Sequence, residues 1–145
     1  MPHSVVIALG SNLGDRRLLL RKAIRELGRV VRLVRVSSVV ETKPVDAPLG
    51  SPDFLNMVVA GYTSLGPEAL LDAMQEIERR LGRVRTRRNA PRTIDLDLIL
   101  YGARRMRTTR LTLPHPRAHR REFVMKPLRE IWPLPLPAAG KKNGD

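Results

Sequence analysis

The first half of the chain alternates short apolar runs with longer amphipathic segments. Short segments rich in apolar and β-branched residues are typical of strands, and such segments predict strands over residues 4–9, 33–40 and 54–62. Between the second and third of these strands, residues 43–53 contain three prolines, so we expect a loop there.

The segment after the first strand has the pattern of an amphipathic helix. The strand ends at Gly10-Ser11-Asn12, and either Asn12 or Asp15 is suited to cap the helix that follows. Gly28 is suited to stop it. Between these limits, the apolar residues that share one helical face are Leu20, Ile24 and Leu27.

A second helix is predicted between Pro67 and Gly82. Proline suits the first turn of a helix, Glu68 complements the positive end of the helix dipole, and glycine commonly follows the last turn. The apolar stripe of this helix is formed by Leu70, Met74, Ile77 and Leu81.

Residues 92–100, with the sequence Arg-Thr-Ile-Asp-Leu-Asp-Leu-Ile-Leu, predict a strand that carries two acidic residues. Strict alternation places Ile94, Leu96 and Leu98 on one face of the strand, and Asp95 and Asp97 on the other. The two aspartates are then roughly 7 Å apart at the backbone. Like charges this close repel each other and are costly to desolvate, so we expect a compensating positive charge.

The predicted elements follow the order β-α-β-β-α-β, and a small hairpin-like region over residues 102–112 comes after the last strand. This order is that of a ferredoxin-like α+β sandwich, with an antiparallel sheet and the helices packed on one face. We expect residues 1–132 to form one domain and residues 133–145, rich in Pro, Gly and Lys, to be a frayed tail. The architecture decides little about function, because many unrelated activities share it.

Composition restricts the class of protein. The chain has 145 residues, of which 42% are hydrophobic, as expected for a globular domain. No apolar run approaches the roughly 20 residues that span a bilayer, and residues 5–9 lead into Gly-Ser-Asn rather than a signal-peptide cleavage site. The absence of cysteine excludes disulfides and thiolate metal sites. We therefore expect a cytoplasmic protein without a membrane partner.

The charge balance predicts an anionic partner. The formal net charge is +13, and 22 of the 27 basic residues are arginines. Such a balance fits nucleic acid, a membrane surface or a polyphosphate ligand. The alternative is that the arginines, above all those of the first helix, reflect genome composition and only solvate the surface. Two dense clusters, residues 79–92 and 104–121, flank the strand that carries the aspartates.

Together, the acidic pair and the arginine clusters suggest phosphoryl-transfer chemistry. Mg²⁺ typically takes one or two carboxylates together with phosphate oxygens and water, so Asp95 and Asp97 are candidate ligands. The simpler interpretation is a solvated acidic pair bridged to arginine.

Residues 10–15 lack both the Lys-Ser/Thr ending of a P-loop and the Gly-x-Gly of a dinucleotide-binding turn. Side chains must then hold any nucleotide, and guanidinium groups suit phosphate well. The available arginines are Arg83, Arg85, Arg88, Arg92, Arg110 and Arg121.

Several motifs, taken in order, carry a resemblance to a known family. They are Ala8-Leu9-Gly10-Ser11-Asn12-Leu13-Gly14, Ser37-Ser38, Glu41-Thr42-Lys43-Pro44, Pro52-Asp53-Phe54-Leu55-Asn56, Gly82-Arg83-Val84-Arg85, Pro91-Arg92-Thr93-Ile94-Asp95-Leu96-Asp97, and Leu113-Pro114-His115-Pro116 followed by Arg121 and Phe123. In this combination the chain resembles the 6-hydroxymethyl-7,8-dihydropterin pyrophosphokinases, from residue 5 to about residue 133.

The resemblance implies a reaction in folate biosynthesis. Members of that family transfer pyrophosphate from ATP to the hydroxymethyl group of the reduced pterin and release AMP. It implies two Mg²⁺ ions, ATP and a reduced pterin as the partners, a monomer, and no nucleic acid. The fold of the family is similar to the sandwich predicted from the pattern.

The resemblance also implies roles for individual residues. The catalytic positions are Arg83, Arg92, Asp95 and Asp97, and the two aspartates hold the metal. The positions that match ATP contacts are Gln75, Glu78, Arg85, Arg92, Arg110, Thr112, His115 and Arg121. The positions that match pterin contacts are Thr42, Pro44, Val45, Phe54, Asn56 and Phe123, with the two phenylalanines stacked on the two faces of the ring.

Two other classes of function compete with this reading. A basic ferredoxin-like sheet is also typical of RNA-recognition domains, which stack bases on aromatic residues. The chain has few aromatic residues and lacks the Lys/Arg-Gly-Phe/Tyr-Gly/Ala-Phe pattern of those domains. A catalytically inactive interaction protein of the same fold is disfavoured by the intact pair Asp95 and Asp97.

Overall fold

The computed structural model describes residues 2–43, 49–50, 52–82 and 93–133. Its elements, in chain order, are β1 (His3–Ser11), α1 (Arg16–Leu27), β2 (Arg32–Val36), β3 (Val40–Thr42), β4 (Phe54–Thr63), α2 (Pro67–Arg80), β5 (Asp95–Tyr101), β6 (Met106–Arg107), β7 (Thr112–Leu113), the 3-10 turn η1 (Ala118–Arg120) and α3 (Glu122–Ile131). None of the helices in these described residues has the length and apolar character needed to cross a membrane.

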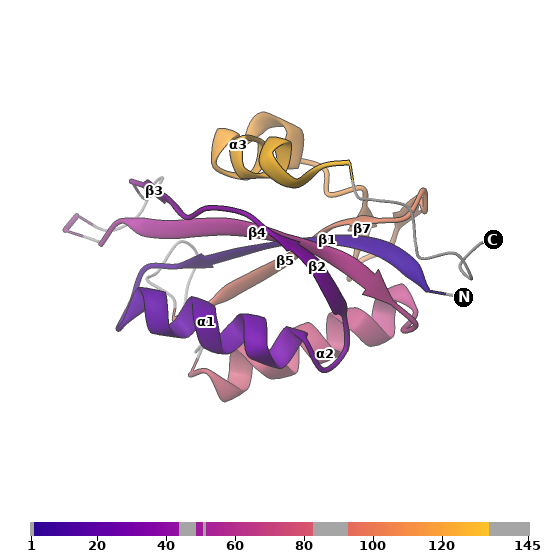
Figure 1. Cartoon of the computed structure of the whole chain (residues 1–145), viewed down its shortest axis with the longest axis horizontal. Helices are drawn as coiled ribbons and strands as arrows, with labels where there is room; N and C mark the ends of the chain where they lie inside the picture. Colours follow the sequence, from indigo (N-terminus) through magenta and orange to yellow (C-terminus); the bar gives the residue numbers. More distant parts are fainter. Residues whose placement is uncertain (1, 44–48, 51, 83–92, 134–145) are drawn as a thin grey trace.

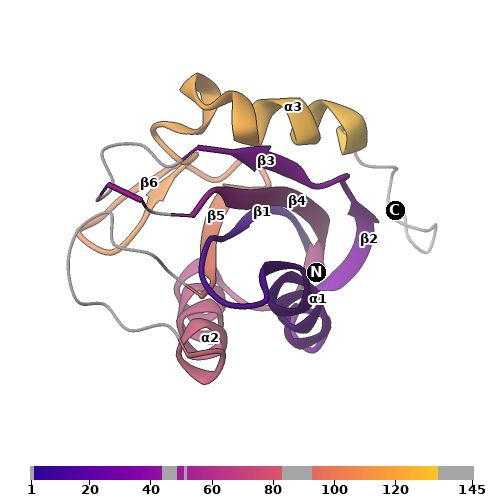
Figure 2. The same ribbon diagram turned by 90° about the vertical axis from the view of Figure 1, so that its left-hand side faces the viewer.

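The centre of the molecule is an antiparallel sheet of five strands. The strand order is β2-β4-β1-β5, and the short strand β3 pairs with β4 beyond the end of β2. Helices α1 and α2 cover one face of this sheet, and α3 covers the other (Figures 1 and 2). Strands β6 and β7 form a separate small hairpin, as predicted for residues 102–112.

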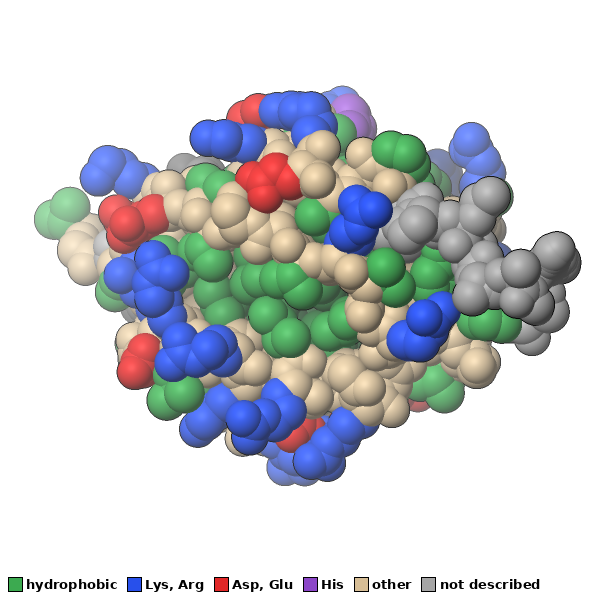
Figure 3. Space-filling view, in the orientation of Figure 1, with side chains coloured by type: hydrophobic (Ala, Val, Ile, Leu, Met, Phe, Trp, Pro, Cys, Tyr) green, Lys and Arg blue, Asp and Glu red, His purple; other side chains and the backbone are tan. Residues whose placement is uncertain are grey.

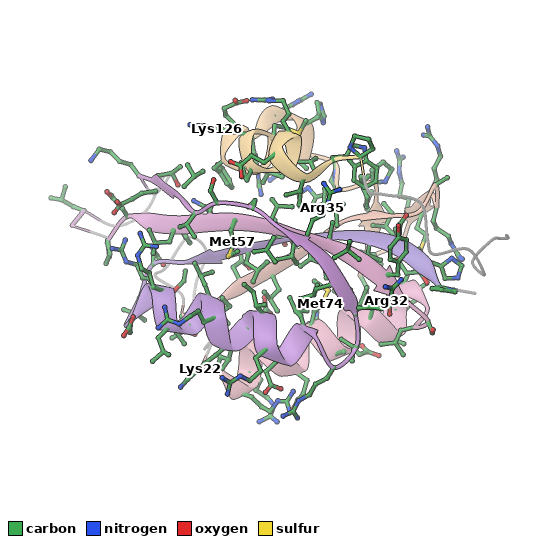
Figure 4. The ribbon with its side chains drawn as sticks, in the orientation of Figure 1. Lys22, Arg32, Arg35, Met57, Met74 and Lys126 are labelled. Atoms are coloured by element: carbon green, nitrogen blue, oxygen red, sulfur yellow. The ribbon has the colours of Figure 1, made fainter. Side chains whose placement is uncertain are left out.

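The main core lies between the sheet and the helices α1 and α2. Alternate residues of β1, Val5, Ile7 and Leu9, point into it and are almost fully buried. Met57 of β4 and Met74 of α2 belong to the same core layer (Figure 4). The two predicted apolar helix faces are confirmed here, because Leu20 and Leu27 of α1 and Leu70, Met74 and Ile77 of α2 are all buried.

A second, smaller core lies on the opposite face, under α3. It joins Val6, Val58 and Ile99 of the sheet to Val124, Leu128 and Ile131 of the helix. The two predicted helices, α1 and α2, do share one face of the sheet, but α3 on the other face was not predicted (Figure 1). Pro127 lies inside α3, and an internal proline normally argues against a helix. The signal that remained was the spacing of Val124, Leu128 and Ile131, which recur at helical intervals.

Side-chain contacts divide one predicted strand and decide between two predicted helix caps. The expected strand over residues 33–40 is divided into β2 and β3, because the Ser37 side chain and backbone both bond to Val58 where the strand bends. The cap of α1 is Asp15, whose Oδ1 accepts a hydrogen bond from the Leu18 N–H at 3.2 Å. Asn12, the other candidate, instead donates to the Pro52 carbonyl at 3.2 Å.

Candidate functional site

The strand register places Asn56, Gly10 and Asp95 in one row across three neighbouring strands. Gly10 of β1 lies opposite Asn56 of β4 on one side and opposite Asp95 of β5 on the other. Two residues further back, Ala8 lies in the same way between Val58 and Asp97. Since adjacent strands are about 4.8 Å apart, Asn56 and Asp95 are about 10 Å apart at the backbone.

All these side chains belong to the face of the sheet that α3 covers. Leu96 and Leu98 are buried in the main core on the other face, while Asp95 and Asp97 are half-buried, so the predicted alternation is confirmed. A Cβ atom built on Gly10 would lie 3.2 Å from Asn56 Oδ1 and 3.5 Å from Phe54 Cδ1. The missing side chain of Gly10 therefore lets the side chains of Asn56 and Phe54 lie close to the β1 backbone. The sequence motif contained Gly10, but its role depends on the register.

Strand β3 places a polar side chain, Thr42, next to Asn56. Thr42 lies opposite Phe54 in the sheet, and the Asn56 side-chain amide donates to Thr42 Oγ1 at 2.7 Å. Three residues predicted to contact the same ligand, Thr42, Phe54 and Asn56, are thus brought together. Pro44 and Val45, assigned to the same role, lie outside the described residues.

His115 is held close to the aspartate row by its backbone and its ring. Its N–H donates to the Ile99 carbonyl of β5 at 2.9 Å, and its Nδ1 accepts from the Arg117 N–H at 3.2 Å. Since Nδ1 is an acceptor, the ring proton of the neutral form resides on Nε2 and is available to an anionic ligand.

The charges around His115 favour its neutral form. Burial lowers the pKa of His115 below its ordinary value, and the cations Arg121 and Arg117 lower it further, while Asp95 opposes them. Arg121 in turn lies over the ring of Phe123, with the guanidinium carbon 5.7 Å from the ring centroid. Phe123, at the start of α3, packs against the smaller core.

Arg110 joins the β6–β7 hairpin to α2. Its guanidinium contacts Asp72 at 2.6 Å, Gln75 at 3.3 Å and Glu68 at 3.4 Å. Two of the positions predicted to contact ATP, Arg110 and Gln75, are therefore in direct contact, and Thr112 follows in β7. This group lies beyond β5, which is the last strand at that end of the sheet order.

Glu78 has a different environment from the other predicted ATP contacts. It is only 3% exposed, and its Oε2 accepts from the Leu96 N–H at 2.7 Å. Leu96 lies between Asp95 and Asp97 in β5, so Glu78 fixes the backbone from which both aspartates project.

The donor set at Asp95 and Asp97 fits magnesium. Among the described residues, no group of three or more His, Cys, Asp or Glu side chains is placed to enclose a metal ion. Two carboxylates on one strand face are what Mg²⁺ takes when phosphate and water complete its shell. The predicted phosphate-binding residues Arg83, Arg85, Arg88 and Arg92 lie outside the described part of the chain.

Most of the exposed cations of α1 do not contribute to this site. Arg17, Arg21, Lys22 and Arg25 are exposed, and they lie on the face of the molecule opposite α3. Figure 3 shows basic side chains gathered over this helix. Arg16 differs, because it donates to the Asp53 carbonyl at 2.8 Å and pairs with Glu41 at 3.3 Å, which ties β3 to the start of β4. No sequence signal indicated this contact, since Arg16 is 25 and 37 positions from its partners.

Comparison with known proteins places this chain in a family. The family model for 7,8-dihydro-6-hydroxymethylpterin-pyrophosphokinase (HPPK) matches residues 6–133. The chain is 46% identical over 133 residues to the 2-amino-4-hydroxy-6-hydroxymethyldihydropteridine pyrophosphokinase of Bacillus subtilis (strain 168), with 90% of this chain and 79% of the relative covered. The enzyme of the same name from Haemophilus influenzae is 45% identical over 127 residues, with 86% and 79% covered.

Some relatives are much longer than this chain. The mitochondrial folate synthesis bifunctional protein of Arabidopsis thaliana is 43% identical over 130 residues, which cover 89% of this chain and 23% of that protein. A solved HPPK-DHPS structure in complex with substrates has a similar fold, with a TM-score of 0.68 at 13% identity, and 92% of this chain and 40% of that chain are covered.

The environment of His115 predicts its titration. We expect a pKa below the ordinary value of about 6.5, because burial and two cations disfavour the imidazolium. Asp95→Asn should lower this pKa further by removing an anion that favours the imidazolium, and Arg121→Gln should raise it. An NMR titration of the ring protons, with the urea-unfolded protein as reference, measures all three. A pKa that rises in Asp95→Asn would contradict the arrangement described here.

Proposed function

The chain belongs to the 7,8-dihydro-6-hydroxymethylpterin-pyrophosphokinase family, and we propose that it transfers pyrophosphate from ATP to the hydroxymethyl oxygen of 6-hydroxymethyl-7,8-dihydropterin, with Mg²⁺ at Asp95 and Asp97 and release of AMP. That it is a pyrophosphokinase of folate synthesis follows from its relatives. We propose, in addition, the metal and the residues that carry out the reaction.

The observation that carries the proposal is the row Asn56, Gly10 and Asp95. It has an amide that could hydrogen-bond a flat heterocycle at one end, an acidic pair at the other, and a residue without a side chain between them. A separation of about 10 Å at the backbone leaves room for a bicyclic ring and its substituent between amide and metal. The substituent that receives the pyrophosphoryl group would then point toward the carboxylates.

The pterin would lie over the sheet near Gly10. Asn56 would hydrogen-bond the ring, Thr42, Pro44 and Val45 would read its edge, and Phe54 and Phe123 would stack on its faces. Asn56 is already oriented by its bond to Thr42, so little side-chain freedom remains to be lost on binding. The absence of a side chain at Gly10 supports this role, because a Cβ there would crowd Asn56 and Phe54.

ATP would lie along the edge strand β5, between α2 and the segment after β7. The residues assigned to it are Gln75, Glu78, Arg85, Arg92, Arg110, Thr112, His115 and Arg121, and Arg83 and Arg92 would act on the transferred group. His115 would donate its Nε2–H to a phosphate oxygen. The burial of Glu78 supports a role in holding β5 in place for the nucleotide and the metal.

Asp95 and Asp97 would hold two Mg²⁺ ions, which supply charge neutralisation for the phosphates and the attacking hydroxyl when bound. The chain itself would do little proton chemistry, because phosphoryl transfer has a loose transition state. Its side chains would orient the two substrates and surround the developing charge with fixed donors.

The domain that carries the proposed site has its own assignment. We assign residues 1–132 as the pyrophosphokinase domain and its frame as ferredoxin-like. The four long strands β1, β2, β4 and β5, linked through α1 and α2, support that topology. Strand β3, the β6–β7 hairpin and α3 are then additions that enclose the site.

The experiment that tests the function separates adenine nucleotides by chromatography after incubation with ATP, Mg²⁺ and the dihydropterin. We expect AMP whose formation depends on the pterin. Formation of ADP would mean single-phosphoryl transfer and a wrong mechanism. A folded sample without nucleotide turnover would contradict the proposal and favour the RNA-binding alternative.

The metal role predicts the behaviour of two variants. Asp95→Asn and Asp97→Asn should each lower the rate of AMP formation roughly 1,000-fold or more, because metal stabilisation is worth several kcal/mol in such reactions. Both should also weaken Mn²⁺ binding measured by electron paramagnetic resonance. Glu76→Gln, at a half-buried carboxylate of α2 paired with Arg79, is the matched control and should change neither quantity. Wild-type turnover in either aspartate variant would rule out the metal role.

A further inference from the structure

One carboxylate of α3 holds the segment between β2 and β3. Glu130 Oε1 accepts from the Ser38 N–H at 2.9 Å, and Glu130 Oε2 accepts from the Ser38 hydroxyl at 2.6 Å. The two residues are 92 positions apart in the chain. Both carboxylate oxygens are thus used on a single residue, which fixes the direction as well as the distance of the contact.

The segment that Glu130 holds is itself fixed to the central sheet. Ser37 N–H donates to the Val58 carbonyl at 2.9 Å, and the Val58 N–H donates to Ser37 Oγ at 2.9 Å. The Ser37 hydroxyl in turn donates to the Ser38 carbonyl at 2.8 Å. Ser37 and Ser38 therefore form a short bridge from strand β4 to helix α3.

This bridge connects two elements of the proposed pterin site, β3 and α3. On one side the chain continues from Ser38 directly into β3, which carries Thr42. On the other side α3 carries Phe123, seven residues before Glu130 and thus about 10 Å away along the helix axis. Phe123 and Thr42 come from different ends of the sequence, and the Ser38–Glu130 contact links the elements that carry them.

Apolar packing holds α3 against the sheet, but by itself it does not fix the position of the helix along the sheet. Val124, Leu128 and Ile131 pack on Val6, Val58 and Ile99, and such contacts tolerate small shifts because they have no direction. Hydrogen bonds to both oxygens of one carboxylate do have direction. The Ser38–Glu130 contact is therefore the part of the interface that would set the position of α3.

We propose that Glu130 is a positioning residue for the pterin: its contact with Ser38 sets Phe123 at stacking distance above a ring held by Thr42 and Asn56. This inference rests on the proposed function. Glu130 touches neither substrate, and it acts through α3 and β3. The effect should therefore fall on pterin binding and leave the ATP side, beyond β5, largely unchanged.

Three variants test the proposal. Glu130→Ala should raise the KM for the pterin about tenfold, because both hydrogen bonds that fix α3 relative to β3 are lost and Phe123 is no longer held in place, with the KM for ATP and kcat within about twofold. Ser38→Ala removes one of the two bonds and should raise it about threefold. Glu130→Gln should stay close to wild type, because its amide oxygen accepts from the Ser38 N–H while its NH₂ donates to the Ser38 hydroxyl.

Glu122→Ala is the matched control. Glu122 is a second exposed glutamate of α3, paired with Arg129 on the same helix, and it makes no link to β3 among the contacts of the described residues. Its loss should leave both KM values unchanged. Thermal unfolding of every variant checks that the smaller core still holds α3 in place.

Three results would overturn the inference while leaving the proposed function intact. They are a wild-type pterin KM in Glu130→Ala, an equal rise of the KM values for ATP and pterin, and failure of Glu130→Gln to restore the pterin KM. Wild-type protein that forms no pterin-dependent AMP would instead overturn the proposed function, and this inference with it.

Discussion

The register of β1 between β4 and β5 is the constraint on which the rest of the structure depends. Because side chains alternate along a strand, a slip of one residue would turn Gly10 toward the main core and bring Leu9 onto the opposite face. The observed register is secured by Val5, Ile7 and Leu9, which are buried against α1 and α2. The packing of one face thus fixes the chemistry of the other, where Asn56, Gly10 and Asp95 stand in one row.

The two faces of the sheet differ: one carries the larger core, and the other carries the smaller core and the residues of the proposed site. The face under α1 and α2 holds the larger core, and Glu78 reaches from α2 to the backbone between the two aspartates. The face under α3 has a smaller core and leaves polar groups beside it. A carboxylate pair is costly in a partly buried place unless positive charge compensates it. Burial lowers the pKa of the nearby His115, and Arg121 and Arg117 lower it further, so its neutral form is favoured.

Short-range patterns predicted most of the fold, and long-range contacts account for the parts that failed. The alternation around Asp95 and Asp97 and the helical stripe of α2 are local, so the sequence displayed them. The break between β2 and β3 depends on Ser37 and Val58, 21 positions apart, and α3 was hidden by Pro127. The candidate site residues came from motifs of a resembling family, whereas the close approach of Asn56 and Phe54 to Gly10 and the contact of Glu130 with Ser38 required the three-dimensional arrangement.

The central claim is that the metal pair and the pterin-binding residues share one face of the sheet, two strands apart. Paramagnetic relaxation by Mn²⁺, bound with a non-hydrolysable ATP analogue, tests it directly in labelled protein. The account predicts much stronger relaxation of the Asn56 side-chain amide than of the methyl groups of Met57, its neighbour on the opposite face, and of Met74 in α2. Relaxation of the two methionines equal to or stronger than that of Asn56 would contradict it.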